Sequence, residues 1–112
     1  MSIPKTYEEF RNRLTDSEPP PLWPEALKAL WWDAGGHWEN SHQIAQDLQS
    51  RTGSWIHAYL HRKEGDRWNA NYWYDRAGRP YPKTSSDEEM EEIVTWLLNA
   101  LEHDPRYFLD QG

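Results

Sequence analysis

The stretch Ser86–Leu101, SDEEMEEIVTWLLNAL, decides the fold class of this chain. Its large apolar residues recur at intervals of three and four positions: Met90, Ile93, Val94, Leu97, Leu98 and Leu101. This spacing places them on one face of an α-helix. Ser86 and Glu89 are predicted to form a capping box at its start, and Pro105 follows its expected end. The acidic side chains of Asp87–Glu92 are expected to lie in solvent and to complement the helix dipole.

Five shorter segments before this helix also carry helical patterns, separated by glycine and proline. The sequence predicts helices over residues 6–14, 24–33, 37–50, 54–65 and 67–76. Thr6, Ser54 and Asp66 are expected to cap three of them, and Gly53 is expected to stop the third. The sequence contains no alternating run of a length useful for a β-strand. We therefore expect an all-α fold, a compact bundle of about five or six short helices.

The whole chain is expected to form one helical domain. Residues 1–21 are predicted to be an N-terminal helix followed by a proline-rich spacer, which contains SEPPP at residues 17–21. Residues 22–104 are predicted to be the core and residues 105–112 a tail. Eight Trp, six Tyr and two Phe supply enough large apolar surface for a tryptophan-rich chain of 112 residues to close a core.

Composition excludes several classes of function. The chain has no cysteine, which excludes disulfides, thiolate metal sites and thiol catalysis, so a metal site must use His, Asp, Glu or Asn. The net charge of −7 argues against a nucleic acid as partner. No segment has the apolar length of a membrane span or of a signal peptide, so we expect no membrane association and a cytoplasmic location.

Chemistry is concentrated in the run WIHAYLHRKEGD at residues 55–66. On a helix, His57, His61 and Glu64 fall at i, i+4 and i+7 and lie along one face. This face borders the apolar stripe, where a crevice between helices would form. Two imidazoles four residues apart commonly share one metal ion, and the carboxylate completes a set of two histidines and one acid.

A fourth metal ligand is expected from the preceding helix, where His42 lies at the margin of the apolar stripe. The short connection should place that helix next to the His-rich one. Asp66 and Asn69 are predicted to bind the outer ring nitrogens of the histidines. The cofactor is therefore unknown from sequence, with a divalent metal ion or a small anionic ligand as the hypothesis.

If the pocket is catalytic, the expected chemistry is hydrolysis or proton transfer. An imidazole of His57 or His61 would act as base, together with Glu64, and Arg62 would hold an anionic group. The alternative is that the His and Glu side chains form a purely structural hydrogen-bond network. In that case the chain is a non-catalytic protein-interaction module that uses exposed aromatic side chains. The sequence leaves the oligomeric state open.

The segment RWNANYWYDR at residues 67–76 carries four aromatic side chains within seven residues. Trp73 is one that could floor a ligand pocket or stack on a planar ligand, with Arg62 or Arg76 supplying cation–π contacts. The favoured interpretation is structural: Trp68 and Trp73 fill the core while the tyrosines half-cover it.

The pattern from His42 to Gly78 resembles a family of small microbial proteins of unknown function. It is carried by WIHA at 55–58, HRKEGD at 61–66, NA at 69–70, YWY at 72–74 and AG at 77–78, about a third of the chain. The resemblance implies no activity. It offers a set of seven polar positions at which such proteins look alike, and their clustering favours a site: His42, His57, His61, Arg62, Glu64, Asp66 and Asn69.

Overall fold

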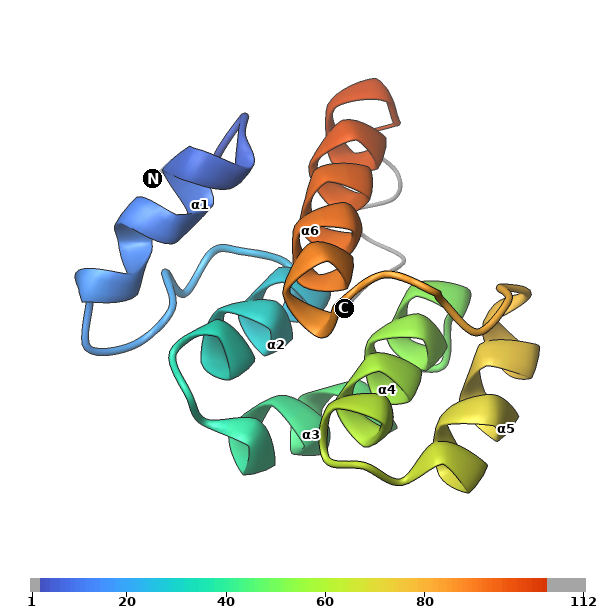
Figure 1. Cartoon of the computed structure of the whole chain (residues 1–112). Helices are drawn as coiled ribbons and strands as arrows, with labels where there is room; N and C mark the ends of the chain where they lie inside the picture. Colours follow the sequence, from blue (N-terminus) through green and yellow to red (C-terminus); the bar gives the residue numbers. More distant parts are fainter. Residues whose placement is uncertain (1–2, 105–112) are drawn as a thin grey trace.

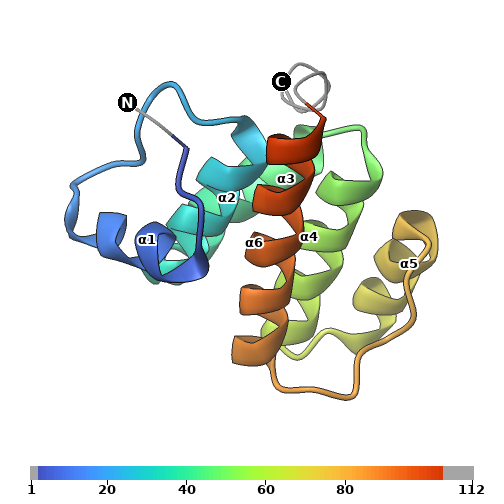
Figure 2. The same ribbon diagram turned by 90° about the horizontal axis from the view of Figure 1, so that it is seen from above.

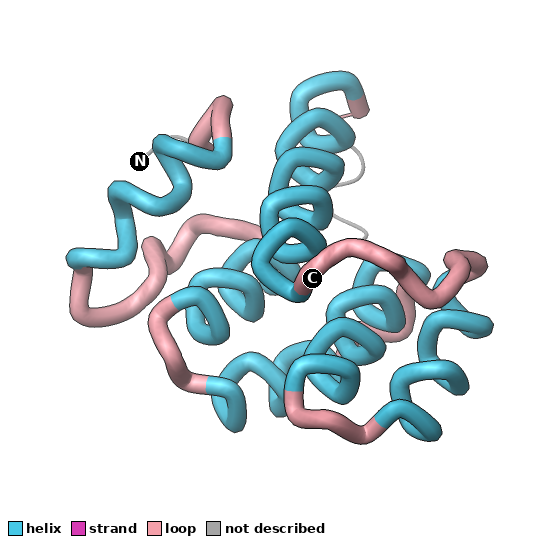
Figure 3. The backbone as a smooth tube through the Cα atoms, in the orientation of Figure 1, coloured by secondary structure: helices cyan, strands magenta, loops and turns pink. Residues whose placement is uncertain are grey.

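The computed structural model describes residues 3–104, and within this range the chain folds into helices joined by short loops (Figures 1 and 3). The helices, in chain order, are α1 (Tyr7–Asn12), α2 (Glu25–Ala34), α3 (Trp38–Asp47), α4 (Arg51–Lys63), α5 (Arg67–Ala77) and α6 (Ser86–His103). A single 3₁₀ turn, η1 (Arg13–Thr15), follows α1. No strand occurs among the described residues, which confirms the all-α prediction. The radius of gyration of 12.9 Å matches one globule of this length.

Helix α4 lies at the centre of the bundle. It packs against α2, α3, α5 and α6. Along most of its length it is buried, including the aromatic and aliphatic side chains of Trp55, Ile56, Tyr59 and Leu60. Helices α1 and α5 lie at opposite ends of the molecule, with α4 and α6 between them (Figures 1 and 2). The buried polar side chains of α4 therefore lie close to a neighbouring helix.

The start of α4 differs from the prediction. Ser50 caps the helix by accepting a hydrogen bond from the Gly53 backbone amide at 3.0 Å, and Gly53 lies inside the first turn. The predicted stop at Gly53 and the predicted cap at Ser54 are therefore wrong. The glycine is needed for space, because an added Cβ would stand 2.5 Å from both the Cβ and the carbonyl oxygen of Leu48. Helix α3 ends at Asp47, before this close approach.

Helix α6 has the predicted apolar face, which is buried from Met90 to Leu98. Its capping box, however, lies one residue earlier than predicted. Ser85 accepts from the Glu88 amide at 3.1 Å, and the Glu88 carboxylate accepts from the Ser85 amide at 3.1 Å. The predicted box of Ser86 and Glu89 is therefore wrong. Glu89 takes no part in the capping box, and its side chain points into the core. The predicted end falls close to the observed one at His103; Pro105 and the rest of the predicted tail lie outside the described residues.

Helix α5 begins and ends where the sequence predicts. Asp66 accepts a hydrogen bond from the Asn69 amide, and Gly78 closes the helix with a left-handed φ of 71°. The predicted burial of its aromatics is wrong in part. Tyr74 is the buried one, at 1% exposure, whereas Trp68 is 79% exposed. Trp73 packs against the core as a half-buried side chain.

Candidate metal centre

Three histidine side chains meet between α3 and α4. His42 projects from α3, and His57 and His61 project from successive turns of α4. The Nε2 atoms of His42 and His57 are 3.0 Å apart. One ring nitrogen from each of the three histidines lies within 4.8 Å of the others. The i, i+4 spacing on α4 and the packing of α3 against it thus place together the three histidines that the sequence singled out.

Two indole rings hold the imidazoles in place. Trp38 stacks on His42 with ring centroids 4.8 Å apart, and its own Nε1 donates to the Leu60 carbonyl at 2.9 Å. Trp73 stacks on His57 at 4.0 Å. The stacked indoles therefore hold the imidazole rings in place, so the histidine side chains would lose less conformational entropy when a ligand binds. Trp73, which the sequence offered either as a ligand-pocket residue or as a core residue, thus contacts a histidine of the cluster.

His57 is the buried member of the cluster, with 5% of its surface exposed. Its Nδ1 atom has no hydrogen-bond partner among the described residues. A neutral imidazole has one donor and one acceptor nitrogen, so the single contact to His42 leaves the other nitrogen unsatisfied in either tautomer. Burying an unsatisfied polar group costs about 1–3 kcal/mol, so this imidazole destabilises the fold if packing is its only role.

Two of the histidines are held in their neutral forms. Burial, reinforced by the neighbouring His42 and His61, lowers the pKa of His57 to about 4. Burial also lowers the pKa of His42, with His61 adding to the effect. Neutral imidazole is the form whose lone pair binds a metal ion. At neutral pH, His42 and His57 therefore have ring lone pairs that can bind a metal ion.

Glu64 is hydrogen-bonded to His61. It is the C-terminal cap of α4, and its Oε2 atom accepts a hydrogen bond from His61 Nδ1 at 2.7 Å. This contact fixes the proton on Nδ1 and leaves the Nε2 lone pair of His61 unused. Carboxylate–imidazole pairs of this kind orient metal-binding histidines in many proteins. In this geometry Glu64 takes the orienting role that the sequence analysis gave to Asp66 and Asn69.

Asp66 and Asn69 are engaged with each other. Both carboxylate oxygens of Asp66 accept hydrogen bonds from Asn69, one from its backbone amide at 3.2 Å and one from its side-chain amide at 2.6 Å. These bonds lower the pKa of the Asp66 carboxyl group. Asp66 can also reach a group with His61 and Glu64, all three ligand atoms lying within 4.8 Å. Its present contacts make it a helix cap rather than a partner of the histidine rings.

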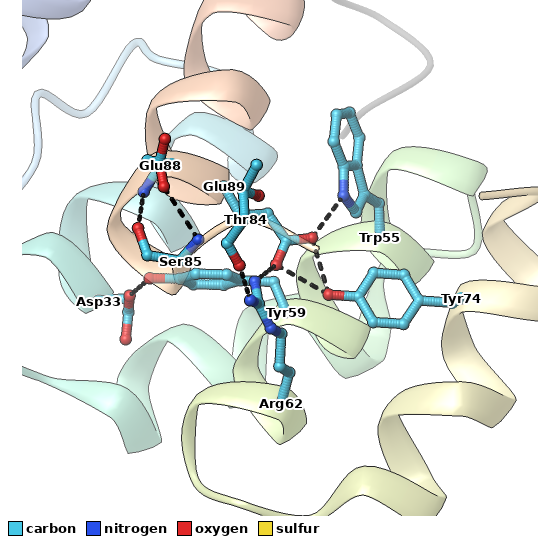
Figure 4. A network of polar contacts seen from close by, with 9 residues as sticks. All are labelled: Asp33, Trp55, Tyr59, Arg62, Tyr74, Thr84, Ser85, Glu88 and Glu89. Atoms are coloured by element: carbon cyan, nitrogen blue, oxygen red, sulfur yellow. Dashed lines mark hydrogen bonds and ion pairs between the residues drawn. The ribbon is translucent and has the colours of Figure 1, made fainter. Parts of the chain in front are cut away.

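Arg62 does not face the histidines. Its guanidinium group donates to Glu89 Oε1 at 2.8 Å and to the Thr84 carbonyl oxygen, on the side of α4 that faces α6 (Figure 4). The predicted role of Arg62, to hold an anionic group beside the histidines, is not supported by this placement. Its charge is instead matched by a buried carboxylate.

Sequence reasoning missed this buried carboxylate. Glu89 is 1% exposed and accepts hydrogen bonds from Trp55 Nε1 at 3.1 Å and from the Tyr74 hydroxyl at 2.7 and 2.8 Å, besides the bond from Arg62 (Figure 4). The expectation that the whole acidic run lies in solvent is wrong at this position. A signal was present, because Glu89 lies four residues before Ile93 and so shares the apolar face of α6.

A second buried carboxylate, on α2, contacts the same face of α4 as Glu89 does. Asp33 accepts a hydrogen bond from the Tyr59 hydroxyl at 2.6 Å and from Lys63 Nζ at 3.1 Å (Figure 4 shows the first contact). Burial and the neighbouring carboxylate raise the pKa of Tyr59, so the phenol stays protonated and donates. Both acids are satisfied by their partners. They hold α2 and α6 to α4.

Comparison with family models, with curated proteins and with solved structures finds no match to this chain. The resemblance carried by residues 42–78 therefore stays a prediction. Within residues 3–104, no helix combines the length and the apolar character needed to cross a bilayer.

Proposed function

We propose that this protein binds a divalent transition-metal ion through His42, His57 and His61, with Glu64 orienting the ring of His61. The observation that carries the proposal is the convergence of three imidazoles from two helices, two of their nitrogens 3.0 Å apart. Nitrogens that bind one tetrahedral zinc ion at 2.0–2.1 Å stand about 3.3 Å apart, so small ring movements would suffice.

The donor set selects the class of ion. Three imidazole nitrogens suit zinc, copper, nickel or cobalt, whereas magnesium and calcium prefer oxygen ligands. The chain has no cysteine to offer a softer ligand. We take zinc as the reference ion, and we expect copper(II) to bind more tightly in vitro, following the general order of affinities.

The competing explanation is a structural hydrogen-bond network of His and Glu side chains. The unpaired Nδ1 atom of His57 counts against a network that exists for stability, which should satisfy its buried members; an ion bound at Nε2 would leave the same nitrogen unpaired, so the convergence of the three rings carries the choice. The contrast with Glu89 supports this reasoning. That carboxylate has a partner for each oxygen, as expected of a structural buried group.

The test is a zinc titration of full-length protein prepared without an affinity tag, by calorimetry and by competition with a chelating dye. Wild type should bind one equivalent and gain thermal stability through mass action. The variants His42→Gln and His61→Gln should lose stoichiometric binding. Glu64→Gln should bind about 10–100-fold more weakly, the usual effect of losing an orienting partner.

The matched control is His103→Gln, which changes an exposed histidine at the end of α6. This variant should bind zinc as wild type does. The proposal fails if wild type binds no ion stoichiometrically, or if the cluster variants bind as tightly as His103→Gln.

As a second candidate function, we propose self-association through the outer face of α5. Trp68 and Tyr72 lie one turn apart and are 79% and 49% exposed, and Arg76 continues the same row. Tryptophan, tyrosine and arginine are the residue types that dominate interface energetics. A second copy offers a complementary surface, because α6 exposes the acidic side chains of Glu91 and Glu92.

Sedimentation over a range of protein concentrations tests this candidate. Wild type should form dimers or larger species, and Trp68→Ser with Tyr72→Ser should remain monomeric without losing zinc binding. A wild type that stays monomeric at every concentration would exclude self-association.

A further inference from the structure

The three-histidine cluster supplies fewer ligands than a tetrahedral ion takes. The group holds three imidazoles and no carboxylate. Structural zinc sites are closed by four protein ligands, while sites with three protein ligands keep one position for water or substrate. We propose that an ion held here keeps an open fourth position, and that this position takes water exchangeable for a small monovalent anion. This inference rests on the proposed metal site.

Glu64 is the nearest carboxylate on the same helix, but its present geometry keeps it off the ion. Its Oε2 atom is bonded to His61 Nδ1 at 2.7 Å. The two nitrogens of an imidazole point to opposite sides of the ring. A carboxylate on Nδ1 therefore stands roughly 6 Å from an ion bound at Nε2, beyond coordination distance.

The other nearby polar side chains are also engaged. Asp66 is tied to Asn69 as the cap of α5, and Arg62 is tied to Glu89. Glu39 acts on His42 only through its charge, which opposes the lowering of the His42 pKa, and it lies exposed on α3 outside the three-histidine group. None of these residues offers a fourth donor in the observed arrangement.

Two of the three histidine rings are partly exposed at the surface. His57 is buried behind the stacked ring of Trp73, while His42 and His61 are only partly buried. An ion between them would be covered on the His57 side and reachable from solvent past His42 and His61. A solute can therefore exchange at the ion without opening the fold.

Charge selects the kind of solute. Three neutral imidazoles leave the double positive charge of the ion intact, and the carboxylate of Glu64 offsets one unit of it. The site then carries about one net positive charge, which one monovalent anion neutralises. Small carboxylates, azide and hydroxide meet this requirement, whereas a neutral amide of similar size does not.

Cobalt(II) spectroscopy tests the inference on the full chain. Cobalt replaces zinc in nitrogen sites, and its visible bands report the number and kind of ligands. Titration of the cobalt-loaded protein with azide, and separately with acetate, should shift these bands saturably with one anion per ion. Acetamide, a neutral molecule matched in size to acetate, should cause no shift. His103→Gln should respond as wild type does, because its exposed histidine is not in the cluster.

The outcomes separate this inference from the proposed function. If wild type binds no cobalt, the proposed metal site itself fails. If cobalt binds but azide and acetate leave the bands unchanged, the site is closed and only the open position is refuted. In that case Glu64→Gln identifies the closing ligand: a variant that gains a response to azide shows that Glu64 had moved onto the ion.

Discussion

Glu89 gives the sharpest test of how this bundle is held together, and Glu89→Gln is the informative change. The wild-type carboxylate accepts only: from Trp55, from Tyr74 and from Arg62 (Figure 4). Glutamine has nearly the same shape, but it replaces one acceptor oxygen with a donor amide group. At least one existing donor would then face another donor, and the guanidinium of Arg62 would lose its counter-charge while 14% exposed.

The magnitude follows from breaking one side of a buried ion pair, which typically costs about 3–5 kcal/mol. That is a large share of the roughly 5–15 kcal/mol that stabilises a domain of this size. At about 4–8 °C per kcal/mol for small domains, the melting temperature should fall by more than about 10 °C. A partner substitution should reveal the coupling: Arg62→Met and Glu89→Gln together should cost less than the sum of the two single changes, by about 1–3 kcal/mol.

Urea unfolding followed by circular dichroism measures these differences directly. The control is Glu92→Gln, which removes an exposed carboxylate from the same helix and should change stability by less than about 0.5 kcal/mol. The reasoning is refuted if Glu89→Gln and Glu92→Gln unfold at the same urea concentration. It is also refuted if Arg62→Met and Glu89→Gln are fully additive, because their effects would then be independent.

Three further outcomes are expected. The pKa of His57 is lowered from 6.5 to about 4 in the folded protein, so on acidification the unfolded chain binds a proton before the metal-free folded protein does. The contribution of His57 to the free energy of unfolding should be complete above pH 6.5 and should fall by roughly 3 kcal/mol as the pH drops to 4. Urea unfolding measures this change, and a profile that stays flat across that pH range would show that His57 is solvated. Gly53→Ala should lower the melting temperature despite the better helix propensity of alanine, because its Cβ would stand 2.5 Å from Leu48 atoms. Gly35→Ala is the control: its Cβ would meet only ordinary contacts at 3.5 Å or more, so this variant should be tolerated. At protein concentrations where the wild type is monomeric, Trp68→Ser should leave the melting temperature almost unchanged but remove a solvent-exposed component from the tryptophan fluorescence, and a large loss of stability would contradict the 79% exposure of that indole.

The sequence alone determined the helical class, the course of α6 and the limits of α5. The heptad-like run from Met90 to Leu101 and the cap residues Asp66 and Gly78 are local features, and local geometry depends on neighbours within one or two turns. The same locality explains the candidate site. His57 and His61 are four residues apart on one helix, so their proximity follows from helix geometry, and His42 needed only a short connection between α3 and α4.

Tertiary packing decided what local patterns could not. Gly53 is a common helix-stop signal, but its role is set by the approach of Leu48. Glu89 is read locally as a solvated acid, and it is buried because Trp55, Tyr74 and Arg62 bring three donors from α4 and α5 to one point. Those donors lie 15 to 34 residues away in sequence. A polar side chain can be buried where the folded state supplies hydrogen-bond partners for it, and for Glu89 those partners come together only in the assembled bundle.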